Sequence, residues 1–428
     1  MKIYDFIAIG LGPFNLSLAA LTQPLDQADA LFLEQRSDFN WHPGMMLEGT
    51  HLQTPFMSDL VTLADPTSPY SFLNYLKQHQ KLYRFYIREN FFILRHEYNL
   101  YCQWVCRQLT NLRFNTRVTA ISFDAEHHCY RLETRRPDGQ DNGLYYARKL
   151  VIGTGPVPHR PDGCDTLGEH AIHSSEYLQQ KPTLLEQPRI SVIGGGQSAA
   201  EIVYDLLDEQ RQRSFHLDWI TRSPRYFPLE YSKLTLEMTS PEYVDYFHSL
   251  PMATRDTLLS QQQNLYKGIN SDLINAIFDR LYEMDLHHAP RVRLLTNTAV
   301  SRVEASGAEF HLSLDHQEQQ RHATLTTNAL IFATGYRAAL PEFLGGIANE
   351  ICWDSKERLA VSRHYAIDKQ QRLFVQNAEL HSHGFVTPDL GMACYRNSVL
   401  LHKLLGWQPY AVEKKIAFQQ FGFDEAGA

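Results

Sequence analysis

Two glycine turns have the residue types and spacing of dinucleotide-binding sites. In the first, GLGPFN follows the apolar stretch YDFIAIG and places Gly10, Gly12 and Asn15 where a helical segment begins. Glycines let a backbone approach a pyrophosphate, and the unpaired N–H groups of a helix N-terminus face its negative charge. Glu34 ends the next apolar stretch, ALFLEQR, at roughly the 20-residue distance where a carboxylate accepts hydrogen bonds from a ribose diol. Pro13 completes the predicted cofactor turn.

The second turn repeats the pattern with a different ending. RISVIGGGQSAAE fits the Gly-x-Gly-x-x-Ala form through Gly194, Gly196 and Ala199. The strand that follows, FHLDWITRSPR, carries Arg222 and Arg225 instead of an acid. Arginine suits a 2′-phosphate, which favours NADPH over NADH; the alternative is two solvated surface arginines. The cofactor positions at the start of this second helix are Gln197 and Ser198.

The elements that position these turns predict an α/β protein with one nucleotide fold inserted into another. Apolar strands in 149–158 and 329–341 break at Thr-Gly, which is typical of crossings between two such domains. FAD in the first fold and NADPH in the second is the economical assignment. Residues 226–290 are aromatic and polar, with Ile274, Ile277, Phe278 and Leu281 at helical spacing, which predicts a helical substrate lobe. The predicted domains are FAD-binding at 1–165 and 326–385, NADPH-binding at 166–225 and 291–325, and the lobe at 226–290 and 386–428.

Composition excludes several classes of function. The net charge is -8 over 428 residues, so no basic face for nucleic acid is expected. No apolar run reaches the roughly 18 residues of a membrane span, and no export signal precedes the first strand, which favours the cytoplasm. Six scattered cysteines form no CxxC; Cys102 and Cys106 are interpreted as core residues of a helix. The tract 127–129, His-His-Cys, is not expected to bind metal because it lacks a second cluster.

The motifs taken together resemble the flavin-dependent N-hydroxylating monooxygenases of siderophore biosynthesis. The resemblance runs from about residue 3 to about residue 405 and rests on GLGPFN, WHPGM, LQTPF, DPTSPYSFLNYL, GGGQSAAE and FATGYR. It implies FAD, NADPH and molecular oxygen as co-substrates. It also implies that a primary amine is oxidised through a C4a-hydroperoxide of the flavin, in a homodimer or homotetramer.

The resemblance also implies roles for individual residues. Gln53 is expected near the flavin and the nicotinamide, where it orders the reactive centre. Trp41 and His42 are expected to line the flavin. The remaining cofactor positions are Thr334 and Gly335 at the strand break, and His383 and Gly384 on the flavin's far side. For His42 and His383 the alternative is a structural histidine.

One motif departs from the pattern of the relatives that act on lysine or ornithine. They carry FLKDL, whose lysine pairs with the substrate carboxylate, where this chain has FMSDL and Ser58. An asparagine of the ornithine enzymes falls near Leu236, and a serine falls near Gly391. A buried carboxylate without partners costs several kcal/mol, so an amino acid should be disfavoured. The hypothesis is an aliphatic diamine, cadaverine or putrescine; the alternative is harmless drift at Ser58.

A diamine brings a second ammonium that needs an acceptor. Glu237 and Asp389 are the two candidates, and each has the alternative of a surface or capping acid. By resemblance, Asn264 is expected to face the nicotinamide or the substrate, and packing is the equal alternative. Three other functions remain open from the sequence: an L-lysine N6- or L-ornithine N5-hydroxylase, a flavin disulfide reductase, and a non-enzymatic FAD-binding protein.

Overall fold

Two separate sheets carry the two glycine turns in a computed structural model that describes residues 1–136, 139, 142–164, 167–287 and 290–423. The first sheet has the order β5-β2-β1-β8-β7-β6, and β19 pairs with β8. β1, β2, β5, β8 and β19 are parallel, while β6 and β7 are antiparallel. The strands are β1 Ile3–Ile9, β2 Ala30–Leu33, β5 Leu112–Arg113, β6 Arg117–Asp124, β7 Cys129–Arg135, β8 Asn142–Ile152 and β19 Leu373–Val375.

The second sheet is fully parallel, with the order β10-β17-β11-β12-β13. A three-stranded antiparallel sheet, β14-β15-β16, packs beside it. The strand at Ala329–Phe332, expected in the first domain, pairs here with β10 and β11, so the boundary expected at residue 326 is wrong. The strands are β10 Ala171–His173, β11 Arg189–Ile193, β12 His216–Ile220, β13 Val292–Leu295, β14 Thr298–Ser306, β15 Glu309–His316, β16 Arg321–Thr327 and β17 Ala329–Phe332.

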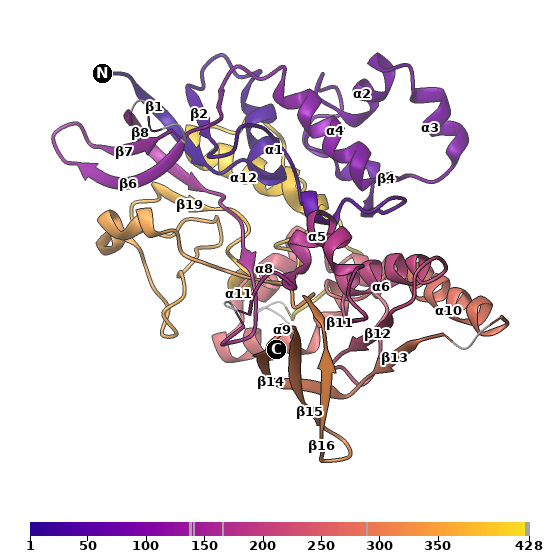
Figure 1. Cartoon of the computed structure of the whole chain (residues 1–428). Coiled ribbons are helices and arrows are strands. Elements are labelled where there is room, and N and C mark those ends of the chain that lie inside the picture. The colour runs from indigo at the N-terminus through magenta and orange to yellow at the C-terminus, as the bar shows by residue number, and fades with distance from the viewer. Residues whose placement is uncertain (137–138, 140–141, 165–166, 288–289, 424–428) are drawn as a thin grey trace.

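The predicted insertion is confirmed. The chain leaves the first sheet after β8, builds the second sheet, and returns after β17 to add β19 beside β8. The two crossings lie side by side, because β9 (Val157–Pro158) pairs antiparallel with β18 (Tyr336–Arg337). Figure 1 shows the first sheet above and the second below, with the gold C-terminal elements β19 and α12 under the first.

The helical lobe is smaller than expected. α8 (Pro241–Ser249) shares a buried cluster with Phe385 and Met392, and α11 (Leu380–His383) contacts α8 and α9 (Met252–Gln261). By contrast, α10 (Ser271–Asp285) packs on α6 (Gln197–Glu209) of the second fold, with Ile277 buried and Phe278 67% exposed. α12 (Ala393–Leu405) packs on α1 (Pro13–Thr22) of the first fold. Helical periodicity thus predicted the helix α10 correctly, but it did not indicate that this helix packs on the second nucleotide fold.

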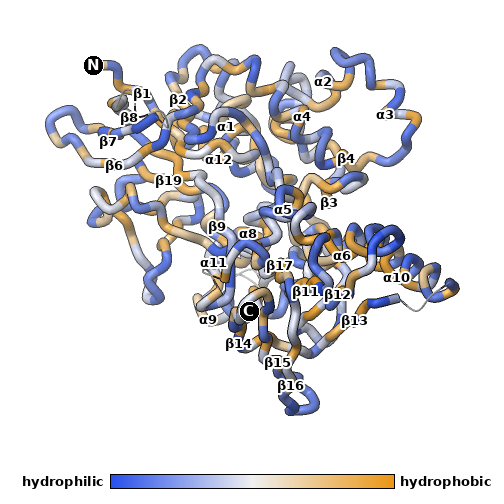
Figure 2. The backbone as a smooth tube through the Cα atoms, viewed as in Figure 1, coloured by the Kyte–Doolittle hydropathy of each residue, from blue (hydrophilic) through white to orange (hydrophobic). Residues whose placement is uncertain are grey.

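The remaining elements surround these cores. Figure 2 shows the apolar strands β1, β8, β19, β11 and β17 as the hydrophobic centres of the two sheets. In the described ranges, no helix is both long and apolar enough to cross a membrane. The other elements are β3 His51–Pro55, β4 Phe92–Leu94, α2 Phe72–Gln78, α3 Leu82–Arg88, α4 Arg95–Cys106, α5 Tyr177–Leu184, α7 Lys233–Leu236, and the 3₁₀ turns η1 Pro43–Met45, η2 Phe56–Ser58, η3 Ser174–Glu176, η4 Gln263–Leu265, η5 Glu342–Glu350 and η6 Leu390–Met392.

Candidate active site

The first glycine turn is fixed from its inner side. Gly10 has a left-handed φ of +86°, and a Cβ there would lie 2.6 Å from the carbonyl oxygen of Gly153, so only glycine fits. Asn15 is buried; its Nδ2 donates to the Gly10 carbonyl (2.6 Å) and its Oδ1 accepts from Gln376 Nε2 (2.7 Å). Asn15, predicted as a cofactor residue, therefore connects the glycine turn to Gln376, the residue that follows β19.

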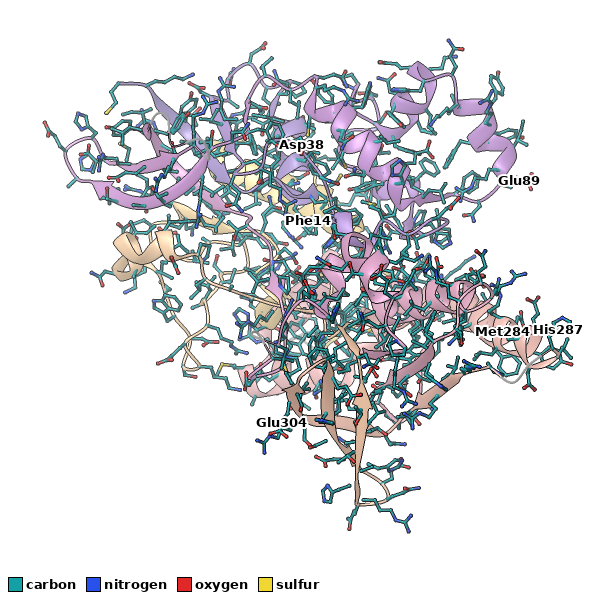
Figure 3. The ribbon with its side chains drawn as sticks, in the orientation of Figure 1. Phe14, Asp38, Glu89, Met284, His287 and Glu304 are labelled. Carbon is teal, nitrogen blue, oxygen red and sulfur yellow. The ribbon has the colours of Figure 1, made fainter. Side chains whose placement is uncertain are left out.

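The outer side of the same turn is open. No atom lies within 4 Å of a Cβ placed on Gly12, which begins α1 without a side-chain cap and is followed by Pro13. One Glu34 carboxylate oxygen accepts from the Leu11 backbone N–H (2.7 Å), which keeps the acid beside the turn. An uncapped helix start with open space and an adjacent carboxylate fits a pyrophosphate and a ribose, so the residues fit FAD. Phe14, which follows Pro13 in the chain, lies at the centre of the molecule, between the two sheets (Figure 3).

The second turn has the same construction with arginines in place of the acid. Gly194 has a φ of +145° and packs on the carbonyl of Ala333, and Gly196 begins α6 without a side-chain cap. Arg222 and Arg225 are exposed and, within the described ranges, neither forms an ion pair; Arg225 lies 4.6 Å over the Phe227 ring. Free guanidinium groups beside an uncapped helix fit a nucleotide that carries an extra phosphate, so the residues fit NADPH. Ser198, in the first turn of α6, is partly exposed.

Gln53 links the first fold to the helix that follows the second glycine turn. It lies on β3 of the first fold, and its Nε2 donates to Oε1 of Gln197, the first residue of α6 (3.3 Å). The same Gln197 oxygen accepts from the Asn270 backbone N–H (2.8 Å). The predicted central residue Gln53 therefore lies at the junction of the two nucleotide folds.

Trp41 and His42 form an aromatic group near this junction. Their rings are 4.9 Å apart, and His42 is 5.8 Å from Tyr336 of β18. His42 has a left-handed φ of 48° and keeps an accessible edge, although protein atoms surround it at longer range. This burial, with the charges of Arg95 and Arg36, lowers the pKa of His42 to about 4, so the ring is neutral at physiological pH.

His383 and Gly384 have packing roles. His383 is buried, stacks on Tyr365 (4.6 Å), and has partners for both ring nitrogens: Ser382 Oγ at Nδ1 (2.9 Å) and the Arg363 carbonyl at Nε2 (3.2 Å). Burial holds the pKa of His383 well below its usual range. A Cβ on Gly384 would press on the Phe247 ring of α8. The structural alternative for His383 is therefore favoured over the predicted flavin contact.

Thr334 and Gly335 belong to the crossing between the folds. The Thr334 hydroxyl donates to the His159 carbonyl, and the Gly335 carbonyl accepts from the His159 N–H (2.9 Å). His173 Nε2 lies 2.9 Å from the same Gly335 carbonyl. These contacts fasten the β9–β18 ribbon, and they occupy the groups that the sequence assigned to the cofactor.

The three substrate positions Ser58, Asp389 and Gly391 meet at one point. A Cβ on Gly391 would lie 3.1 Å from Asp389 Oδ1 and 3.3 Å from Ser58 Oγ. Ser58 is 8% exposed in η2, and its neighbour Asp59 anchors that turn by accepting four hydrogen bonds, one of them from the N-terminus of α2 at Phe72 (2.7 Å). The resemblance placed Ser58 and Gly391 at one head-group site, and η2 and η6 do meet there.

Asp389 is a carboxylate without an ion-pair partner among the described residues. It caps η6 through the Gly391 N–H (2.7 Å), and burial raises its pKa, with Arg396 acting in the opposite direction. Tyr231, which the sequence reasoning missed, lies near enough for the Asp389 charge to raise the phenol's pKa, second to burial. The Tyr231 ring is 6.3 Å from Phe92 of β4, so it reaches from the helical lobe to the first fold.

The other substrate positions serve a different purpose. Glu237 accepts from the backbone N–H groups of Phe418 (2.9 Å) and Gln419 (3.0 Å), so it fastens the C-terminal tail and is not the ammonium acceptor we predicted. Leu236, at the end of α7, is 36% exposed. Asn264 Nδ2 donates to Glu230 (3.1 Å), which supports the segment that carries Tyr231. Leu236 and Glu237 are therefore not part of the group formed by Ser58, Asp389 and Gly391.

Comparison with known proteins defines the family. The model of the L-lysine 6-monooxygenase/L-ornithine 5-monooxygenase family matches residues 2–338. The chain belongs to this family. Putrescine N-hydroxylase from Shewanella oneidensis is 50% identical over 98% of this chain and 84% of its own length. A cadaverine monooxygenase of desferrioxamine biosynthesis from Erwinia amylovora, solved bound to FAD, is 54% identical over 99% of both chains, with a TM-score of 0.97. Ornithine hydroxylase from Pseudomonas aeruginosa is 30% identical over 95% of this chain and 99% of its own, with a TM-score of 0.85.

Membership of the monooxygenase family excludes two of the three open functions and leaves the L-lysine N6- or L-ornithine N5-hydroxylase as the alternative. This monooxygenase is an enzyme that uses FAD and NADPH, which excludes the non-enzymatic FAD-binding protein. The disulfide-reductase alternative also fails on the cysteines, because no two of them form the CxxC pair that such an enzyme needs beside its flavin. Burial raises the pKa of Cys106 and of Cys394 to about 12, far from a reactive thiolate.

Proposed function

We propose that this monooxygenase N-hydroxylates one primary amine of an aliphatic diamine, cadaverine or putrescine, for the biosynthesis of a hydroxamate siderophore. The observation that carries the proposal is the group formed by Ser58, Gly391 and Asp389, which offers a carboxylate where an amino-acid enzyme needs a cation. The named activities of the putrescine and cadaverine relatives agree with it. The alternative is an L-lysine N6- or L-ornithine N5-hydroxylase.

Charge at this group separates the two. The distal ammonium of a diamine would pair with Asp389, which forms no ion pair within the described ranges, although the charge of Arg396 acts on it from a distance. The carboxylate of lysine or ornithine would instead meet the Asp389 carboxylate, and two neighbouring carboxylates repel each other. Ser58 offers a hydroxyl that hydrogen-bonds either substrate weakly.

The chain's own residues supply binding, orientation and exclusion of water. The reduced flavin supplies oxygen activation when FAD is bound. The reacting amine must be neutral, because an alkylammonium of pKa about 10.4 has no lone pair to donate. A desolvated position lowers that pKa, and neutral His42 adds no competing positive charge near the junction.

We assign FAD to the first glycine turn and NADPH to the second. Gly10, Gly12 and Glu34 support the first assignment, and Gly194, Gly196 and the two arginines after β12 support the second.

We place the reaction in the cytoplasm, where NADPH is supplied. We further propose a homodimer or homotetramer, since α3 exposes Tyr83, Tyr86 and Ile87 by 78%, 70% and 72%. Light scattering of the purified protein would test the oligomer.

Paired assays of NADPH oxidation and hydroxylamine formation test the substrate. Cadaverine, putrescine, lysine and ornithine are compared at one pH with the FAD-loaded protein. Hydroxylamine from the diamines alone is the expected result. Comparable product from lysine or ornithine would mean that another group replaces the missing lysine, and the diamine proposal would fail.

A further inference from the structure

A buried ion pair joins the two nucleotide folds. Arg95, the first residue of α4 in the first fold, donates from Nη2 to Glu201 Oε1 (2.7 Å) and from Nη1 to Glu201 Oε2 (2.9 Å). Glu201 lies in the second turn of α6, the helix that follows the second glycine turn. Their side chains are 13% and 3% exposed. A bidentate arginine–carboxylate contact fixes orientation as well as distance.

Each partner is tied to its own fold and to the cofactor junction. Arg95 also donates to the Met45 carbonyl (2.8 Å), in the turn that follows Trp41 and His42. Glu201 Oε1 accepts from Gln197 Nε2 (2.9 Å), and Gln197 Oε1 accepts in turn from Gln53 Nε2 (3.3 Å). A continuous set of hydrogen bonds therefore runs from the ion pair to the two glutamines at the junction.

Besides the ion pair, a single hydrogen bond from Gln53 to Gln197 (3.3 Å) and apolar packing cross this boundary. Met45 and Leu47 of the first fold pack in the apolar core of the second, and apolar burial stabilises contact without fixing orientation. The covalent connections are the two crossings of the β9–β18 ribbon. The ion pair is bidentate and shorter than the Gln53–Gln197 hydrogen bond, so it constrains the orientation of α6 on the first fold more strongly.

We propose that Arg95 and Glu201 are positioning residues that set the second glycine turn, and with it the nicotinamide, against the flavin. The proposal rests on the assignment of FAD to the first turn and NADPH to the second. In the step concerned, a hydride passes from the nicotinamide to the flavin, which oxidises NADPH and reduces FAD. α6 begins at Gln197, directly after the turn, so a shift of Glu201 moves the turn as well. A misplacement of about 1 Å can slow a reaction by about 100-fold.

The test is the reductive half-reaction, which needs no amine and so does not depend on the substrate proposal. FAD-loaded Glu201→Gln, Arg95→Ala and Arg95→Lys variants are mixed with NADPH without oxygen, and flavin bleaching is followed by stopped flow. NADP⁺ binding is measured by titration calorimetry. We expect Glu201→Gln and Arg95→Ala to lower the saturating reduction rate by about tenfold or more, with NADP⁺ affinity and FAD content nearly unchanged. Arg95→Lys, which keeps the charge, should recover part of the rate.

A matched control separates positioning from general loosening. Asp218 is 1% exposed and pairs with Arg293 (2.6 Å) and Arg189 (3.1 Å) of the second sheet, so Asp218→Asn removes a buried carboxylate whose ion pairs do not cross the boundary. It should lower the melting temperature and leave the reduction rate unchanged. Reduction by Glu201→Gln at the wild-type rate, an equal slowing by Asp218→Asn, or a loss confined to NADP⁺ affinity would each overturn the proposal. A wild-type flavin that NADPH fails to reduce would refute the cofactor assignment instead.

Discussion

Replacing Asp389 by Asn removes the proposed acceptor of the distal ammonium and changes little else. Asparagine has nearly the same shape, and its side-chain oxygen can still accept from the Gly391 N–H that Asp389 caps at 2.7 Å. The variant therefore tests the charge of this side chain. Folding should survive, because burial raises the pKa of Asp389 and thus disfavours its ionised form in the folded protein.

The expected loss follows from the interaction removed. A hydrogen bond to a charged group contributes about 1.5–3 kcal/mol. At about 1.4 kcal/mol per factor of ten, kcat/KM for cadaverine should fall by roughly 10- to 100-fold. A monoamine of the same length, 1-aminopentane, has no distal ammonium and should react equally well with both forms.

The assay compares the wild-type enzyme and Asp389→Asn with each of the two substrates, cadaverine and 1-aminopentane, and measures hydroxylamine formation. Glu237→Gln is the matched control, since Glu237 binds the tail residues Phe418 and Gln419. It should leave both substrates unaffected. If Asp389→Asn slowed cadaverine and 1-aminopentane equally, Asp389 would be only a capping acid and the ammonium subsite would be refuted.

The pH dependence of KM for cadaverine tests the charge of Asp389 in a second way. Asp389 must be ionised to attract an ammonium, and its folded pKa is raised, so KM for cadaverine should rise as the pH falls through that pKa. The Asn variant should lack this rise. The free energy of unfolding changes with pH in the other direction from substrate binding. Between the unfolded and the folded pKa of Asp389, the folded protein binds a proton that the unfolded protein has lost, so raising the pH through this window destabilises the fold. The substrate-free Asn variant should therefore melt no lower than wild type at neutral pH.

Three further substitutions test the neighbouring assignments. Ser58→Lys would place an ammonium beside Asp389, so KM for cadaverine should rise by about 10-fold or more; an unchanged KM would mean that Ser58 is remote from the substrate. Gly391→Ala puts a Cβ 3.1 Å from Asp389 Oδ1, so the diamine KM should rise while FAD content, read from the flavin spectrum, stays constant. Arg222→Ala should weaken NADPH by roughly 10- to 100-fold and leave NADH unaffected; an equal loss for both would assign Arg222 to the surface.

Local sequence patterns identified the parts of the cofactor sites that are local. Gly10, Gly12 and Glu34 lie within one strand–helix–strand unit, β1–α1–β2, so residue type and spacing sufficed to predict their meeting. The failures were non-local. His383 became a packed histidine through Tyr365 and Arg363, and the strand 329–332 joined the second sheet through β10 and β11. An apolar strand indicates burial but not the partner strand.

The sequence by itself determined that two dinucleotide folds are present, that one is inserted in the other, and that the lysine of amino-acid enzymes is replaced by Ser58. Those features depend on neighbours in the chain and on residue type. Only the tertiary structure decided which acid lies beside Ser58. Glu237 and Asp389 were equivalent in the sequence, but chain folding brings η6 to η2 and leaves Glu237 on the tail. The Arg95–Glu201 pair was also visible only in the tertiary structure, because a contact between residues far apart in the chain leaves no periodic signal in either segment.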